Sequence, residues 1–206
     1  MIADETRIIS DAMNGDLDAF NRLVIAYQQL AFNVAYRILT DETTAEDATQ
    51  AAFISAYKNL KSYRGGSFRA WLLRMVTNAC YDELRRQKRR PTLPLEPQTE
   101  DGSDEMESPV WLADDAPDPE ETYSQKELEQ AVMDCLSRLP EEFRVISVLI
   151  DVQGMDYEEA SQVVGKPLGT IKSRLARARL RLRDCMQRFR ELLPAKFRLG
   201  IEDPHG

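Results

Sequence analysis

The sequence predicts an all-α fold made of two small four-helix domains joined by an acidic, flexible linker. Apolar residues recur at helical spacing through most of the chain, and its 206 residues include only nine glycines and few extended β-branched alternations. Residues 91–121 are instead rich in Pro, Asp, Glu and Ser, with too little apolar surface to offset the entropy of ordering. We therefore expect domains over residues 1–90 and 122–193, a linker over 91–121 and a short tail over 194–206.

Four helices are predicted in the first domain, each with its own start or stop signal. A short helix is expected over residues 5–13, and a longer one with a broad apolar face follows Asp16. Thr44 is the predicted cap of the third helix. A loop with paired glycines then leads to Ser67, which should cap a fourth helix that ends at Pro91.

The second domain is predicted to end in two helices joined by a tight turn. Its first helix starts near Glu120, and Pro140 starts the next one with two glutamates in the first turn. Asp156 caps the following helix, and a glutamate three residues later completes a capping box. Gly165 supplies the positive φ that ends this helix, and Pro167 prevents it from continuing. This pattern indicates a helix-turn-helix.

The second helix of the pair carries a dense row of arginines. Its apolar positions fall at helical spacing and can pack inward, which leaves the cations on the outer face. A solvated basic helix in a bundle is the alternative, but the turn chemistry and the sign of the charge favour a helix that enters the DNA major groove. The residues expected in that groove are Thr170, Lys172, Ser173, Arg174 and Arg177. Arg181 is expected on the phosphate backbone, where it adds salt-dependent affinity.

The distribution of charge supports two nucleic-acid-binding modules, although the net charge of the whole chain is −8. Residues 91–122 contain eleven acidic side chains and no basic one. Residues 166–198 contain eleven basic side chains against two acidic ones, and residues 58–90 contain ten against two. Two basic modules therefore flank an acidic connector, and the average charge hides the expected binding surfaces.

A second candidate nucleic-acid site lies at the start of the fourth helix. Tyr63 and Phe68 stand beside Arg64 in the loop, and Asn78 on the helix can hydrogen-bond a base. Aromatic rings beside cations suit single-stranded DNA, because stacking works on any base face. The motif is weak by itself, since aromatic residues at helical spacing, such as Phe68 and Trp71, more often belong to a core.

The third helix is unusually polar for a helix that must also pack. Asp47 and Gln50 are three residues apart and therefore share a face. Capping of the helix N-terminus by Asp47 is the simpler interpretation of this pair when no other observation is considered.

Several classes of function are not supported by the sequence. No Ser/His pairing and no glycine-rich phosphate loop occurs, so we do not expect an enzyme or a cofactor. Cys80, Cys135 and Cys185 lie far apart and His205 is in the tail, so zinc and a disulfide framework are poorly supported and buried or half-buried thiols are expected. No apolar run is long enough to cross a membrane and no signal peptide is present, which predicts a cytoplasmic protein.

Four segments taken together resemble one family, the extracytoplasmic function (ECF) group of bacterial sigma-70 factors. The matching segments are AEDATQAAF at 45–53, YRGGSFRAWL at 63–72, TNACYDELRR at 77–86 and LPEEFRVI at 139–146, the last continuing into the helix-turn-helix. They occur in the order of the family and cover nearly all of the chain outside the linker and the two ends. Each motif is moderately specific, and their combination is highly specific.

The resemblance implies a sigma2-like domain over 1–90 and a sigma4-like domain over 122–193. The first would bind core RNA polymerase at the β′ coiled coil through Asp47, Gln50 and Phe53. It would also open the promoter −10 element and hold its bases with Tyr63, Arg64, Ser67, Phe68 and Asn78. The second would read the −35 element as a duplex with the arginine-rich helix. The β flap is a further expected contact with core RNA polymerase.

The resemblance also implies control by an anti-sigma factor. One departure from the family is Ala51, where an acidic residue commonly follows the glutamine. That change weakens one expected polar contact with polymerase without removing the interface. The alternative hypothesis is a free-standing helix-turn-helix transcriptional regulator, for which the polar third helix and the loop at 63–68 have no obvious use.

Overall fold

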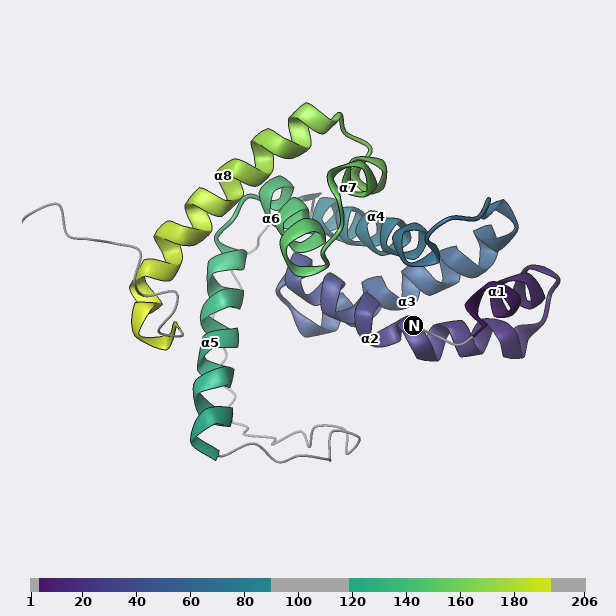
Figure 1. Cartoon of the computed structure of the whole chain (residues 1–206), viewed down its shortest axis with the longest axis horizontal. Helices are drawn as coiled ribbons and strands as arrows, with labels where there is room; N and C mark the ends of the chain where they lie inside the picture. The colour runs from purple at the N-terminus through teal and green to yellow at the C-terminus, as the bar shows by residue number, and fades with distance from the viewer. Residues whose placement is uncertain (1–3, 90–118, 194–206) are drawn as a thin grey trace, which may run out of the picture.

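The structure, a computed structural model, describes residues 4–89 and 119–193, with side chains in the second range from Lys126 onward. Every element within these ranges is helical, which confirms the all-α prediction (Figure 1). The first group of helices contains α1 (Glu5–Met13), α2 (Leu17–Leu39), α3 (Glu42–Asn59), the 3₁₀ turn η1 (Leu60–Ser62) and α4 (Phe68–Arg89). The second group contains α5 (Pro119–Ser137), α6 (Glu141–Ser147), the π-helical turn η2 (Val148–Val152), α7 (Tyr157–Val164), α8 (Leu168–Met186) and the 3₁₀ turn η3 (Gln187–Leu192).

The predicted linker and tail lie largely outside the residues that the structure describes. Residues 91–118, with the apolar segment Val110-Trp111-Leu112, and residues 194–206 lie outside the described part of the chain. Helix α5 begins at Pro119, so the second helical group starts within the stretch assigned to the linker.

Short polar side chains begin the helices of the first group. The Asp16 carboxylate accepts two backbone N–H groups at the start of α2. Ser67 Oγ accepts the N–H of Ala70 at the start of α4, as predicted. The prediction that Thr44 caps α3 is wrong. Asp41 is the cap, and its Oδ1 accepts both the backbone N–H of Thr44 at 2.9 Å and the Thr44 hydroxyl at 2.7 Å. These hydrogen bonds stabilise the ionised form and hold the pKa of Asp41 below its usual value.

The helix-turn-helix forms with the predicted turn chemistry. Asp156 Oδ1 accepts the backbone N–H of Glu159 at 2.7 Å, and the Glu159 carboxylate accepts the N–H of Asp156, which completes the capping box. Gly165 ends α7 with a φ of +66°, a backbone conformation that L side chains rarely adopt. Pro167 then stands immediately before α8.

Helices α5 and α8 are joined by a disulfide between Cys135 and Cys185, whose Cα atoms are 5.7 Å apart. The expectation of free thiols at these two positions is therefore wrong. Because 50 positions separate them along the chain, only the return of α8 alongside α5 brings them together. Cys80 is a buried thiol, as predicted, and burial raises its pKa to about 12.

The two helical groups share one buried apolar cluster. It contains Ile38 of α2 and Val76 of α4 from the first group, and Phe143 and Leu149 from the second. Removal of this apolar surface from water favours the closed packing of α6 and α7 on α2 and α4 (Figure 1). None of the helices in the described ranges is both long and apolar enough to span a membrane.

Polar contacts also join the two helical groups. One Arg69 nitrogen donates to the backbone carbonyl of Gln153 at 2.6 Å and to its side-chain oxygen at 2.9 Å. At the other end of α4, the Lys88 ammonium lies 2.9 Å from a carboxylate oxygen of Glu141. These contacts fix the second group along the length of α4.

Candidate nucleic-acid and protein interfaces

Helix α8 has one face toward the body of the protein and one toward solvent. Ile171, Leu175 and Ala178 are almost fully buried, which anchors the helix against α6 and α7. Lys172 and Ser173 are exposed on the opposite side. The helix-turn-helix thus presents the front of α8 outward, as the sequence predicts for an element that enters a groove of DNA.

Arg177 is the least constrained cation on this outer face. It is exposed and makes no ion pair or hydrogen bond within the described residues. Thr170, at the beginning of the helix, is half-buried. The Lys172 ammonium lies 5.6 Å from the centre of the Tyr157 ring, which orients its long side chain toward the start of α7.

Arg174 occupies a different position from the one predicted. Its guanidinium lies 2.7 Å from a carboxylate oxygen of Glu142 on α6, and its side chain is only 23% exposed. The reason is helical periodicity, because position 174 is three residues after Ile171 and four before Ala178 and therefore borders the buried side of α8. Assigning Arg174 to the outer, base-reading face is therefore a misplacement in this arrangement.

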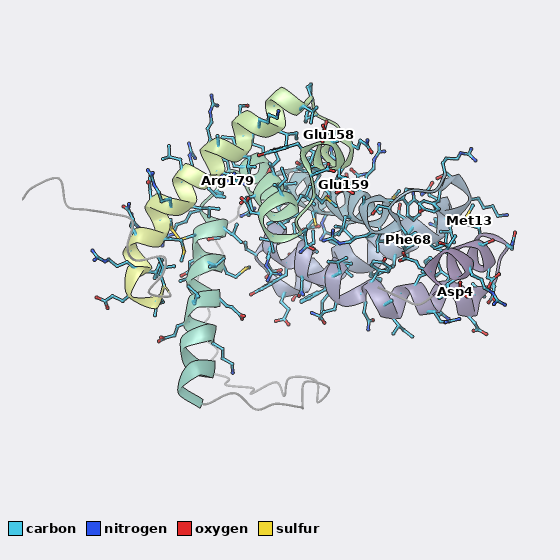
Figure 2. All side chains as sticks on the ribbon, viewed as in Figure 1. Asp4, Met13, Phe68, Glu158, Glu159 and Arg179 are labelled. Carbon is cyan, nitrogen blue, oxygen red and sulfur yellow. A yellow bond between two sulfur atoms is a disulfide. The ribbon has the colours of Figure 1, made fainter. Side chains whose placement is uncertain are left out.

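The cations farther along α8 are engaged with the protein. The guanidinium of Arg181 lies 5.2 Å from the centre of the Phe143 ring, although the residue is exposed. Arg179, labelled in Figure 2, holds Asp151 through two nitrogens at 3.0 and 2.6 Å. Neither contact was evident in the sequence, because each partner lies in a distant segment.

The aromatic rings of Tyr63, in the loop before α4, and Phe68, the first residue of α4, are both buried. Phe68, labelled in Figure 2, is 3% exposed, and Tyr63 is 9% exposed. The Tyr63 hydroxyl donates to the carbonyl of Gly66 at 2.7 Å, and its ring packs on the edge of Phe68 and Trp71. A ring enclosed in this way has no free face for a base, so direct stacking by Tyr63 and Phe68 is not compatible with this conformation.

The polar residues of the same loop are accessible. Arg64 and Ser67 are exposed, and the paired glycines between them both have a φ near +90°. Asn78 is also exposed, but it lies ten positions beyond Phe68 on α4, a separation of about 15 Å along the helix axis. The residues predicted to hold unpaired bases are therefore divided between the loop at 63–67 and α4.

The predicted protein-binding residues line a groove between α2 and α3. The groove has a volume of about 640 Å³, and its α3 wall includes Asp47, Gln50 and Phe53. Asp47 and Gln50 are exposed, whereas Phe53 is half-buried against the core. Asp41 caps the helix, so Asp47 is not needed as a cap and is free to face the groove.

The opposite wall of this groove was not predicted. It is formed by side chains of α2, namely Val24, Gln28, Gln29 and Phe32. Three of them fall at 24, 28 and 32, the four-residue spacing of one helical stripe. The stripe borders the buried face of α2, and polar Gln28 interrupts it, so it did not stand out in the sequence.

Comparison with protein families gives two matches that follow the two helical groups. The model for Sigma-70 region 2 matches residues 23–90, and the model for Sigma-70, region 4 matches residues 129–182. Outside these segments lie α1, the start of α2, the connector, the start of α5 and the end of α8 with η3.

Curated proteins with similar sequences carry the same designation. The chain is 33% identical over 176 residues to the RNA polymerase sigma-H factor of Pseudomonas aeruginosa, which covers 85% of this chain and 90% of that protein. It is 34% identical over 173 residues to the ECF RNA polymerase sigma-E factor of Escherichia coli, covering 84% and 88%. The ECF RNA polymerase sigma factor SigE of Mycolicibacterium smegmatis is 34% identical over 168 residues, which span 82% of this chain and 62% of that longer protein.

Two solved structures share the fold at lower sequence identity. CnrH in complex with the cytosolic domain of CnrY aligns with a TM-score of 0.63 and 24% identity, covering 91% of this chain and 99% of that one. The sigma factor RpoE in complex with the anti-sigma factor NepR from Bartonella quintana gives 0.61 and 22%, covering 83% and 98%.

Proposed function

Because the chain belongs to the ECF group of RNA polymerase sigma factors, which direct transcription initiation, we propose specific surfaces for its contacts with polymerase and promoter. The observation that carries the assignment to DNA is the outer face of α8. This face is exposed after the turn in which Gly165 ends α7, and Arg177 on it is unpaired within the described residues. This face would read the −35 element as duplex DNA.

In this proposal the residues of α8 divide into two roles. Thr170, Lys172, Ser173 and Arg177 meet the DNA at the front of the helix, and Arg181 approaches the phosphate backbone. Arg174 acts from behind, because its pairing with Glu142 fixes α8 on α6. The sequence information is then carried mainly by Arg177, whose planar fork matches the two acceptors of guanine.

The first helical group would bind core RNA polymerase and open the −10 element. The groove with Asp47, Gln50 and Phe53 offers carboxylate and amide groups above an apolar floor, which suits a helical partner such as the β′ coiled coil. Arg64, Ser67 and Asn78 are the exposed groups available to unpaired bases. Tyr63 and Phe68 support the loop that presents Arg64 and Ser67, whereas Asn78 stands farther along α4.

The two solved structures that share the fold suggest a further partner. CnrH and RpoE were both solved as complexes, RpoE with an anti-sigma factor. By analogy an anti-sigma factor would control this chain too, covering its polymerase-binding surfaces until a signal arrives. The protein would act in the cytoplasm as a non-enzymatic subunit, because promoter DNA and polymerase are its proposed partners.

The polymerase assignment is tested by co-elution with core RNA polymerase on gel filtration. The wild-type chain should co-elute, and Asp47→Asn together with Gln50→Ala should reduce the bound fraction. Glu42→Gln is the matched control, since it removes a carboxylate from the same helix at an exposed position outside the groove. A wild-type chain that binds duplex DNA tightly by itself but never co-elutes with core polymerase would favour a free-standing regulator instead.

A further inference from the structure

A basic cleft lies where the two helical groups meet, and none of the proposed promoter or polymerase contacts uses it as a whole. It has a volume of about 810 Å³ and is walled by the end of α4, the α5–α6 junction and the turn before α8. Five cationic side chains line it, against two carboxylates; the cations are Arg85, Lys88, Arg144, Lys166 and Arg174. The two carboxylates, Glu141 and Glu142, are already paired with Lys88 and Arg174.

Arg144 is the least expected of these cations, because it is 6% exposed. One of its terminal nitrogens donates to the backbone carbonyl of Ser137 at 3.2 Å, and its Nε–H has no acceptor within the described residues. No carboxylate in the described ranges forms an ion pair with it. Burial lowers the pKa of Arg144, while nearby Glu141 and the Cys80 thiol oppose that effect. A buried guanidinium in this state lacks the anion that normally accompanies it.

The remaining cations are poorly neutralised from inside the cleft. The Lys166 ammonium forms no ion pair among the described residues. Arg85 pairs with Asp82 on its own helix, a contact made at an exposed surface outside the cleft wall. Exposed pairs of this kind are weak and are readily exchanged for a stronger anion.

We propose that this cleft binds a small polyphosphate anion of nucleotide size. Guanidinium and ammonium groups on three sides can share the oxygens of consecutive phosphates, which is the chemistry that clustered Arg and Lys recognise best. Tyr81, Leu139 and Val164 supply an apolar wall suited to a base or ribose. The volume lies within the range of about 300–1,000 Å³ that is common for small-ligand sites.

Binding at this position would couple the two helical groups. Arg85 and Lys88 belong to α4, whereas Arg144, Lys166 and Arg174 belong to the second group. An anion held by both sets adds to the Lys88–Glu141 contact and stabilises the closed packing by its differential affinity for that state. The proposal therefore goes beyond promoter recognition and does not depend on it.

The experiment is isothermal titration of the full chain with ATP and with inorganic triphosphate, at constant ionic strength. Both probes should bind the wild-type chain, and Arg85→Gln with Lys88→Gln should weaken binding at least about tenfold. The matched control is Arg86→Gln with Arg89→Gln. It removes the same charge from the same turns of α4, but these side chains line the groove toward α3. The control should bind like the wild type.

A variant from the opposite wall, Lys166→Gln, separates a built site from a basic patch on α4. Lys166 is exposed, so its replacement should weaken binding without altering the melting temperature. Equal weakening by both α4 pairs, or absence of wild-type binding at millimolar probe, would overturn the proposal. The proposal would also be overturned if a DNA duplex bound in a way that requires Arg85 and Lys88 while neither ATP nor triphosphate bound.

Discussion

Reduction of the disulfide between α5 and α8 should destabilise the second helical group by a measurable amount. Cys135 and Cys185 are 50 positions apart, so the bond closes a long loop in the unfolded chain. The chain-entropy model gives about 4 kcal/mol at 25 °C for a loop of this size, and measured effects are typically about 2–4 kcal/mol. For a chain of this length we therefore expect Tm to fall by roughly 5–15 °C.

The assay is thermal unfolding followed by far-UV circular dichroism, with and without dithiothreitol. The wild-type chain should show the shift, whereas Cys135→Ser with Cys185→Ser should melt at one temperature in both conditions. Comparison of the two conditions is cleaner than comparison of the two proteins, because Cys135 is 1% exposed and its replacement also alters packing. Three titratable thiols in the unfolded, unreduced wild-type chain, or a Tm unaffected by dithiothreitol, would refute the reasoning.

Three further predictions concern single side chains. Arg177→Ala should weaken binding to the −35 duplex by about 1–3 kcal/mol, with the loss confined to one base pair. Arg174→Ala should weaken the same binding less, because Arg174 pairs with Glu142. A larger loss for Arg174→Ala in competition binding would reverse their roles. Asp41→Ala should cost about 1 kcal/mol in urea unfolding through loss of the α3 cap. The folded-state pKa of Asp41 is lowered, so its contribution is present above the unfolded pKa of 3.8 and is lost as pH falls through the folded value. A mutational cost that does not decline at all as pH is lowered below 3.8 would contradict this. Phe68→Ala should destabilise the first helical group by about 3–5 kcal/mol in the same assay, and a stable variant defective only in promoter opening would restore a direct role in base stacking.

Local signals in the sequence were sufficient for most helix boundaries. Asp156 and Gly165 define α7 through chemistry contained within a few residues of each terminus, and the structure shows both caps. The cap of α3 was misassigned because Asp41 and Thr44 are both good capping residues three positions apart. In the structure they cooperate, since Asp41 accepts from the backbone and the hydroxyl of Thr44.

Contacts between distant segments could not be predicted in the same way. The Cys135–Cys185 bond and the Arg179–Asp151 pair depend on how α8 packs, which no local pattern encodes. The inward position of Arg174 was available from periodicity, because it belongs with Ile171 and Ala178. The density of arginines on α8 concealed that periodicity.

The loop at 63–68 illustrates a different limit. An aromatic ring beside an arginine has the same sequence signature whether it stacks on a base or packs in a core. Only the burial of Phe68 and the hydrogen bond from Tyr63 to Gly66 separate the two roles. The choice depends on tertiary packing that brings α1 and α2 over the loop.

The most direct test of the chain as a promoter-specificity subunit is run-off transcription with purified core RNA polymerase. Addition of the chain should produce transcripts that start at defined promoters, and Arg177→Ala should reduce them without reducing co-elution with core polymerase. Normal binding to core polymerase without initiation at any promoter from the native host would contradict the assignment.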